Sequence, residues 1–145
     1  MPSAVPFDLD RFVTAQKPVI DRAISELAAG RKTSHWMWFV FPQIAGLGRS
    51  DMARRYAILS RAEAVAYLED PILGQRLVQC TELVSALTDK RAHDIFGAPD
   101  DMKFQSSMTL FDAVSPPANI FAAALTKFFA GARDAATLDL LGTIL

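Results

Sequence analysis

Apolar residues recur along most of the chain at spacings of three and four, the period of an amphipathic helix. The clearest example follows Asp70-Pro71, an N-cap residue with proline at the first helical position. Five residues form its apolar stripe: Leu73, Leu77, Cys80, Val84 and Leu87. Alternation with period two is never sustained, and no Asn-Gly or Asp-Gly hairpin turn occurs. The pattern predicts an all-α protein.

Capping and stop residues divide the rest of the chain into further helices. Ser60-Arg61-Ala62-Glu63 is a capping box, and Gly30 is a natural stop for a helix that begins near Pro18. The other expected first residues or caps are Asp8, Ser50, Asp100 or Asp101, Ser115-Pro116 and Asp134. We therefore expect one domain over residues 1–145, a compact orthogonal arrangement of about seven helices with short loops.

The segment from His35 to Ser50 is the most unusual part of the sequence. It contains both tryptophans, and Trp36–Phe41 is compatible with a short strand or a helix. We favour a helix, because a lone strand has no partner to pair with. For Trp36, Phe39 and Phe41 we expect a place in the core, since large aromatic residues of a small domain are mostly buried.

Composition and charge narrow the classes of function. The chain is 51% hydrophobic and 21% charged with a mean hydropathy of +0.19, which is typical of a packed globular protein. A net charge of −1 gives no electrostatic basis for binding nucleic acid or an anionic membrane. One cysteine, Cys80, and two histidines make a metal site unexpected, and Cys80 on the apolar stripe is expected to be buried and unreactive. We find no signal peptide and expect a cytoplasmic protein without cofactors.

The second half of the His35–Ser50 segment is the first candidate site. Gly46 and Gly48 permit a tight turn or close approach to a ligand, and Ser50 begins a helix whose free N–H groups attract anions. Arg49, Arg54 and Arg55 are close by in sequence. Two glycines before a helix are a weak pattern by themselves. This segment has neither the dinucleotide-binding fingerprint nor the lysine of a P-loop. His35 is a candidate catalytic residue because histidine titrates near neutral pH, although a structural histidine, buried and donating to a carbonyl or capping a helix, is the commoner case.

The second candidate site lies on the segment from Lys103 to Asp112. Three hydroxyl residues within four positions of a helix conflict with helix propensity, and such conflicts sometimes mark function. The residues concerned are Ser106, Ser107 and Thr109, with Lys103 nearby. One interpretation is a cluster that binds phosphate or carboxylate. The other is close helix packing through small residues, with Lys103 in solvent.

Together these two segments carry a resemblance to a known family. The residues on which the resemblance rests are 35–43, Gly46-Leu47-Gly48 with Ser50, and 103–111. With them the chain resembles a bacterial family catalogued as domain of unknown function 1810, over nearly its whole length. The resemblance implies a small, single-domain, all-helical fold and no activity, cofactor or catalytic residue. Some members carry the label calpastatin. An inhibitor of that kind is a polar, disordered chain, whereas this one is hydrophobic and regularly capped.

Two hypotheses for function follow. In the first, the protein binds an anionic small ligand, such as a nucleotide or an ADP-ribose-like molecule, in one polar pocket. The Gly46–Ser50 turn and the Lys103–Thr109 helix would face each other there, with Trp38 stacked on a planar base. In the second, Trp36, Trp38 and Phe41 are exposed and anchor a protein partner without chemistry. Aromatic side chains in a concave pocket favour the first, and aromatic side chains on a convex surface favour the second.

Overall fold

A computed structural model describes residues 7–143, in which every named element of secondary structure is a helix. Ten helices occupy this part of the chain, against about seven expected, because several of them are only one turn or two turns long. In order they are α1 Asp10–Gln16, α2 Ile20–Ala28, α3 Met37–Val40, α4 Asp51–Arg55, α5 Arg61–Glu69, α6 Leu73–Ser85, α7 Ala92–Phe96, α8 Asp100–Ala113, α9 Ile120–Phe129 and α10 Ala135–Thr143.

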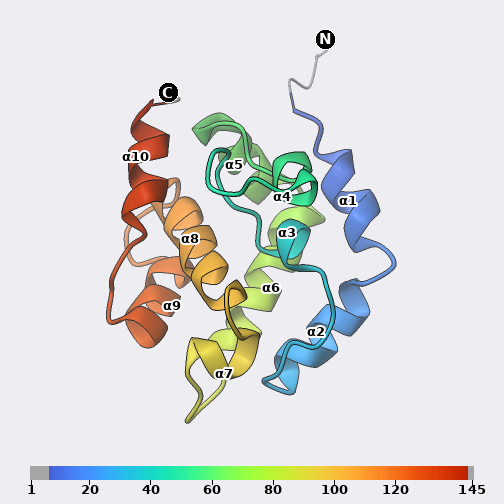
Figure 1. Cartoon of the computed structure of the whole chain (residues 1–145), viewed down its shortest axis with the longest axis vertical. Coiled ribbons are helices and arrows are strands. Elements are labelled where there is room, and N and C mark those ends of the chain that lie inside the picture. Colours follow the sequence, from blue (N-terminus) through green and yellow to red (C-terminus); the bar gives the residue numbers. More distant parts are fainter. Residues whose placement is uncertain (1–6, 144–145) are drawn as a thin grey trace.

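The two longest helices, α6 and α8, run through the middle of the molecule (Figure 1). Helix α2 packs against α6 on one side, while α9 and α10 pack against α8 on the other. Helix α5 contacts both central helices, and α1 lies against α3. The described residues contain no strand, and one isolated parallel bridge joins Ile44 to Ile58. The predicted all-α class is confirmed.

Three of the predicted helix caps are confirmed. The side-chain oxygens of Ser50, Ser60 and Asp134 accept hydrogen bonds from the backbone N–H groups three residues later, over 3.0–3.1 Å. In the predicted capping box, Glu63 departs from the expected pattern. Its carboxylate accepts from the Leu59 N–H at 2.8 Å and pairs with Arg11. Glu63, which the local pattern assigned to the start of the helix, therefore forms an ion pair with Arg11, a residue distant in sequence.

Other predicted helix starts are wrong by a few residues. Leu9 rather than Asp8 precedes α1, and Pro99 precedes α8, so that Asp100 and Asp101 lie inside its first turn. Two turn residues, Pro71 and Ile72, separate Asp70 from α6, although Asp70 still accepts from the N–H of Leu73 at 2.9 Å. Side-chain caps and first-turn acids use the same residue types, so the local sequence does not distinguish them.

The predicted start of α9 at Ser115-Pro116 is also wrong. Asn119 is the N-cap, and its Oδ1 accepts from the N–H of Ala122 at 2.8 Å. Ser115 Oγ instead donates to the Phe111 carbonyl at 2.7 Å, at the end of α8. The proline pair 116–117 lies in the connection before α9.

The aromatic segment is helical and buried, as predicted. Trp36 and Phe41 are fully buried and Phe39 nearly so, within one connected core. Phe41 packs edge-on against Phe104 of α8 with ring centroids 5.1 Å apart, a favourable aromatic geometry. Helix α3 thus fixes the central aromatic layer of the fold.

A single carboxylate anchors the chain as it enters α3. Glu26 of α2 accepts from the Trp36 indole Nε1 at 2.9 Å, from Ser34 Oγ at 2.6 Å and from the N–H groups of Thr33 and Ser34. Partial burial opposes ionisation of Glu26, but these hydrogen bonds outweigh it and lower its pKa to about 2. The ionised Glu26 therefore holds the segment before α3 against α2.

Candidate functional site

Two segments that follow α3 and α4 come together through a pair of backbone hydrogen bonds. The Ile58 N–H donates to the Gln43 carbonyl, and the Ala45 N–H donates to the Ile58 carbonyl, each over 2.8 Å. These bonds form the Ile44–Ile58 bridge, and both isoleucines are fully buried. The loop after α3 and the chain after α4 therefore share one fixed wall.

A cavity of about 250 Å³ lies beside this wall. We call it the Trp38 pocket. Its lining consists of Trp38, Gln43, Ile44, Ala45, Gly46, Gly48, Ala53, Arg54, Tyr56, Ala57 and Leu59. The lining combines aromatic rings, backbone of the glycine turn, one amide and one guanidinium. That mixture is typical of small-molecule sites, which are largely apolar with a few placed polar groups.

Arg54 is the charged residue of this lining. Its side chain forms no ion pair or hydrogen bond with any residue that the structure describes, and it is exposed. A guanidinium without a carboxylate partner offers its N–H donors to an anionic group of a ligand. The Trp38 pocket can therefore hold a planar molecule with a negative charge at the Arg54 end.

Three of the predicted ligand-binding residues line the Trp38 pocket, namely Trp38, Gly46 and Gly48. Arg49 and Ser50 are exposed and outside the lining. Ser50 caps a helix of only five residues, and Asp51 places a carboxylate in its first turn. This arrangement does not favour an anion at the start of α4, because the carboxylate already occupies the positive end of the helix dipole.

Packing explains both glycines of the turn. Gly46 has a φ of +104°, and a Cβ there would lie 3.1 Å from Leu140 Cδ2 of α10. A Cβ on Gly48 would lie 2.4 Å from the Cβ of Ala53, closer than side chains approach each other. The glycines let the turn pack against α10 and α4, and in doing so they shape the Trp38 pocket.

Lys103 lies beside the pocket through its contact with Trp38. Its Nζ is 5.4 Å from the centroid of the Trp38 ring, a cation–π distance, and 3.5 Å from Asp100 Oδ1. Asp100 also pairs with Lys32 at 2.7 Å. Lys103 itself does not line the pocket, but its positive charge lies over the ring of Trp38, which does.

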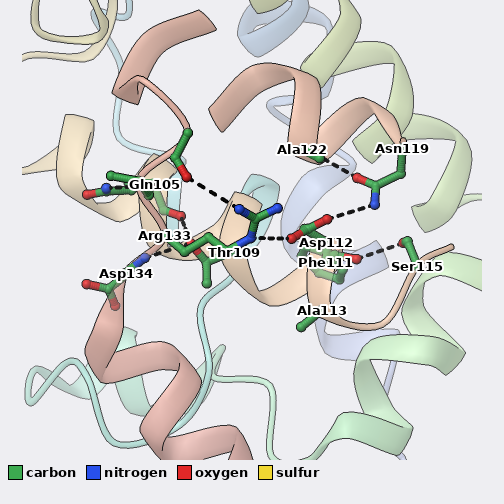
Figure 2. Close-up of polar contacts among 12 residues, drawn as sticks. Gln105, Thr109, Phe111, Asp112, Ala113, Ser115, Asn119, Ala122, Arg133 and Asp134 are labelled. Carbon is green, nitrogen blue, oxygen red and sulfur yellow. Dashed lines mark hydrogen bonds and ion pairs between the residues drawn. The ribbon is translucent and has the colours of Figure 1, made fainter. Parts of the chain in front are cut away.

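Two of the three hydroxyl groups predicted to face the ligand instead form hydrogen bonds within α8. Ser106 Oγ donates to the Met102 carbonyl at 3.1 Å, and Thr109 Oγ1 donates to the Gln105 carbonyl at 2.8 Å. Thr109 Oγ1 also accepts from the Asp134 N–H at 3.0 Å, which ties α8 to the start of α10 (Figure 2). Ser107 is fully buried, and its hydroxyl has no partner among the described residues. These placements match the alternative of close helix packing.

The remaining candidates lie away from the pocket. His35 is exposed and lines no part of it. Trp36 and Phe41 are fully buried, so neither is available as an exposed anchor for a partner. Cys80 is fully buried as predicted, and burial raises its pKa to about 12, which keeps the thiol protonated.

Over residues 7–143, histidine, cysteine and acidic side chains nowhere gather in threes as metal ligands. None of the ten helices of that region is both long and apolar enough to span a bilayer.

Sequence reasoning missed Gln43, Tyr56 and Leu59 as pocket residues. Arg54 was noted as a nearby charge without a role. No local signal marks these residues, because they join the lining only through the Ile44–Ile58 bridge. A hint exists in the apolar Tyr56–Leu59 run, which follows a helix of only five residues and so packs separately from it.

Comparison with known proteins identifies the family. The sequence profile of a family described as "Protein of unknown function (DUF1810)" matches residues 6–141. Among solved structures, the chain is similar to the conserved hypothetical protein Rv1873 from Mycobacterium tuberculosis. The identity is 51% and the TM-score 0.93, over 94% of this chain and 98% of the other. No curated protein matches the chain with significance. The extent of the profile match and the close structural similarity together show that this chain belongs to the DUF1810 family.

Proposed function

We propose that the protein binds a small planar anion in the Trp38 pocket. The observation that carries this proposal is the meeting of Trp38 and Tyr56 with Arg54 around one cavity of about 250 Å³. Aromatic side chains bind flat rings by stacking, and a guanidinium binds carboxylate or phosphate groups. A nucleotide-like molecule has both parts.

The proposed site differs in composition from the one expected from sequence. It keeps Trp38, Gly46 and Gly48, and it adds Gln43, Arg54 and Tyr56. Lys103 belongs to it indirectly, through the positive charge over the Trp38 ring. Arg49, Ser50 and the α8 hydroxyl groups are left out, since none of them lines the cavity.

Calorimetry with the common ribonucleosides and their 5′-monophosphates tests the proposal. Stacking of a base on an aromatic side chain contributes ~1–3 kcal/mol, so Trp38→Leu is expected to weaken binding about tenfold. Met102→Ala is the matched control, because Met102 is an exposed apolar residue of α8 outside the pocket lining. Absence of binding by the whole panel, or equal binding by wild type and Trp38→Leu, would contradict the proposal.

A further inference from the structure

A second cavity adjoins the Trp38 pocket. It has a volume of about 320 Å³ and shares Arg54, Ala57 and Leu59 with the first cavity. Its other lining residues are Phe7, Asp8, Arg11, Arg55 and Glu63. We call it the arginine pocket, because three arginines contribute to its lining. The two cavities are neighbours with Arg54 at their junction.

One of these arginines is already neutralised. Arg11 Nη1 lies 3.1 Å from Glu63 Oε2, and Arg11 also donates to the backbone carbonyls of Ala57 at 2.7 Å and Arg55 at 2.9 Å. Glu63 is fully buried and its pair with Arg11 satisfies its charge. This pair joins α1 to α5 and to the end of α4, so it fixes one wall of the arginine pocket without adding net charge.

The other two arginines are available to a ligand. Neither Arg54 nor Arg55 has an ion pair with a residue in the described part of the chain, and both are exposed. The Arg55 guanidinium lies 5.5 Å from the ring centroid of Tyr56, whose side chain lines the neighbouring Trp38 pocket. Two consecutive guanidinium groups thus border one cavity, and arginine binds phosphate through paired N–H donors.

The size of the cavities indicates a ligand in two parts. Pockets for small molecules usually have volumes of ~300–1,000 Å³. The first cavity, at about 250 Å³, lies just below that range, and the second, at about 320 Å³, lies at its lower end. A ring system fills the first, and the second leaves room for a compact charged group. We propose that the arginine pocket is a phosphate subsite, so that the ligand is a planar ring carrying a phosphate. For its ring half, this inference rests on the function proposed above.

Asp8 supplies a test of opposite sign. Asp8 is among the residues that line the arginine pocket, and its carboxylate has no ion pair with a described residue, so its negative charge disfavours a phosphate bound there. Asp8→Asn removes this repulsion. A variant that is expected to strengthen binding is a useful test, because damage to the fold would weaken binding and so could not produce the expected result.

The experiment is calorimetry with inorganic phosphate, ribonucleosides and their 5′-monophosphates. We expect monophosphates to bind at least about tenfold more tightly than nucleosides, since charge-assisted hydrogen bonds are the stronger class. Arg55→Met is expected to remove most of that advantage and leave nucleoside affinity within about twofold. Asp8→Asn is expected to raise monophosphate affinity about two- to threefold. Arg22→Met is the control, because Arg22 is an exposed arginine of α2 outside both pockets.

Two further results separate this inference from the function proposed above. Nucleosides that bind in a Trp38-dependent way, with no gain from the phosphate, would overturn the phosphate subsite and leave the Trp38 pocket standing. A second result would be that Arg55 is needed for inorganic phosphate to bind, while Trp38→Leu changes the affinity of no ring-containing ligand. That result would contradict the ring half of the proposed ligand, and with it the two-part ligand. Equal affinities in wild type, Arg55→Met and Asp8→Asn would also overturn the subsite.

Discussion

At Gly48 the absence of a side chain has a steric cause. The turn passes α4 so closely that an added Cβ would lie 2.4 Å from the Cβ of Ala53. From the sequence, Gly46 and Gly48 were expected to permit a tight turn or a close approach to a ligand. In the structure, Gly48 permits packing of backbone against a helix, and that packing forms one side of the Trp38 pocket.

We therefore expect Gly48→Ala to lower the free energy of unfolding by ~1–3 kcal/mol, the usual cost of overpacking. Denaturant unfolding measures this loss. Gly142→Ala is a matched control, because a Cβ at Gly142 of α10 meets no atom within 4 Å and alanine favours a helix. The double variant Gly48→Ala with Ala53→Gly should recover part of the loss. A double variant less stable than Gly48→Ala alone would disprove the steric explanation.

The sequence identified several residues whose role is local. Ser50, Ser60 and Asp134 cap the helices they were expected to cap, since a cap depends on bonds within one turn. Residues with distant partners were misread. Glu63 pairs with Arg11 across the fold, and Thr109 accepts from the N–H of Asp134. Neither partner is visible at the spacing of a helix turn.

Among the elements, α2 and α3 are joined by the carboxylate of Glu26. Its four hydrogen bonds reach the Trp36 indole, the Ser34 hydroxyl and two backbone N–H groups. The short helix α3 has no side-chain cap of its own. Glu26 therefore fixes the chain that leads into α3, through groups that precede the helix rather than through the N–H groups of its first turn.

Glu26 also makes stability depend on pH. Its folded pKa, about 2, lies below the ordinary value of 4.5. The stabilisation is therefore fully present above pH 4.5 and is lost as pH falls towards 2. At neutral pH we expect Glu26→Gln to cost about 2 kcal/mol, the scale of hydrogen bonds to a charged group. Unfolding measured between pH 2 and pH 7 should show the difference between wild type and variant vanishing at the acid end.

The control for this series is Glu82→Gln. Glu82 is exposed on α6 and has no ion pair within the described region, so its substitution should leave the pH profile unchanged. A constant gap between wild type and Glu26→Gln across the whole pH range would show that the carboxylate charge is not the cause.

Element boundaries were harder to predict than element type. The start of α9 was placed at Ser115-Pro116, yet Asn119 caps it, because Asn119 also donates to Asp112 at 2.8 Å and so ties α9 to α8 (Figure 2). Helix α7 was not predicted, since five residues cannot show a helical period. Asp94 defines its start, because the Asp94 carboxylate accepts from the backbone N–H of Arg91 at 2.9 Å.

For the whole molecule, the helical class and the buried aromatic layer followed from periodicity and composition. The candidate site was half predicted. Residues 38–48 form one side of it, and their glycines and tryptophan are conspicuous in the sequence. The other side, from Ala53 to Leu59, joins through the bridge between Ile44 and Ile58. Nothing in the sequence indicates that these two isoleucines pair with each other.

The contact of Leu140 with the Gly46 turn has a consequence for the dynamics of the C-terminal helix. Leu140 packs where a Cβ of Gly46 would lie, so α10 supports a wall of the Trp38 pocket without lining it. Local opening of α10 removes that support, and by linkage a ligand that needs the wall favours the closed helix. Hydrogen–deuterium exchange should therefore slow at the amides of α10 when the Trp38 pocket is filled, and Leu140→Ala should uncouple the two. Amide exchange in α10 would then report whether the Trp38 pocket is filled, although α10 does not contact the ligand.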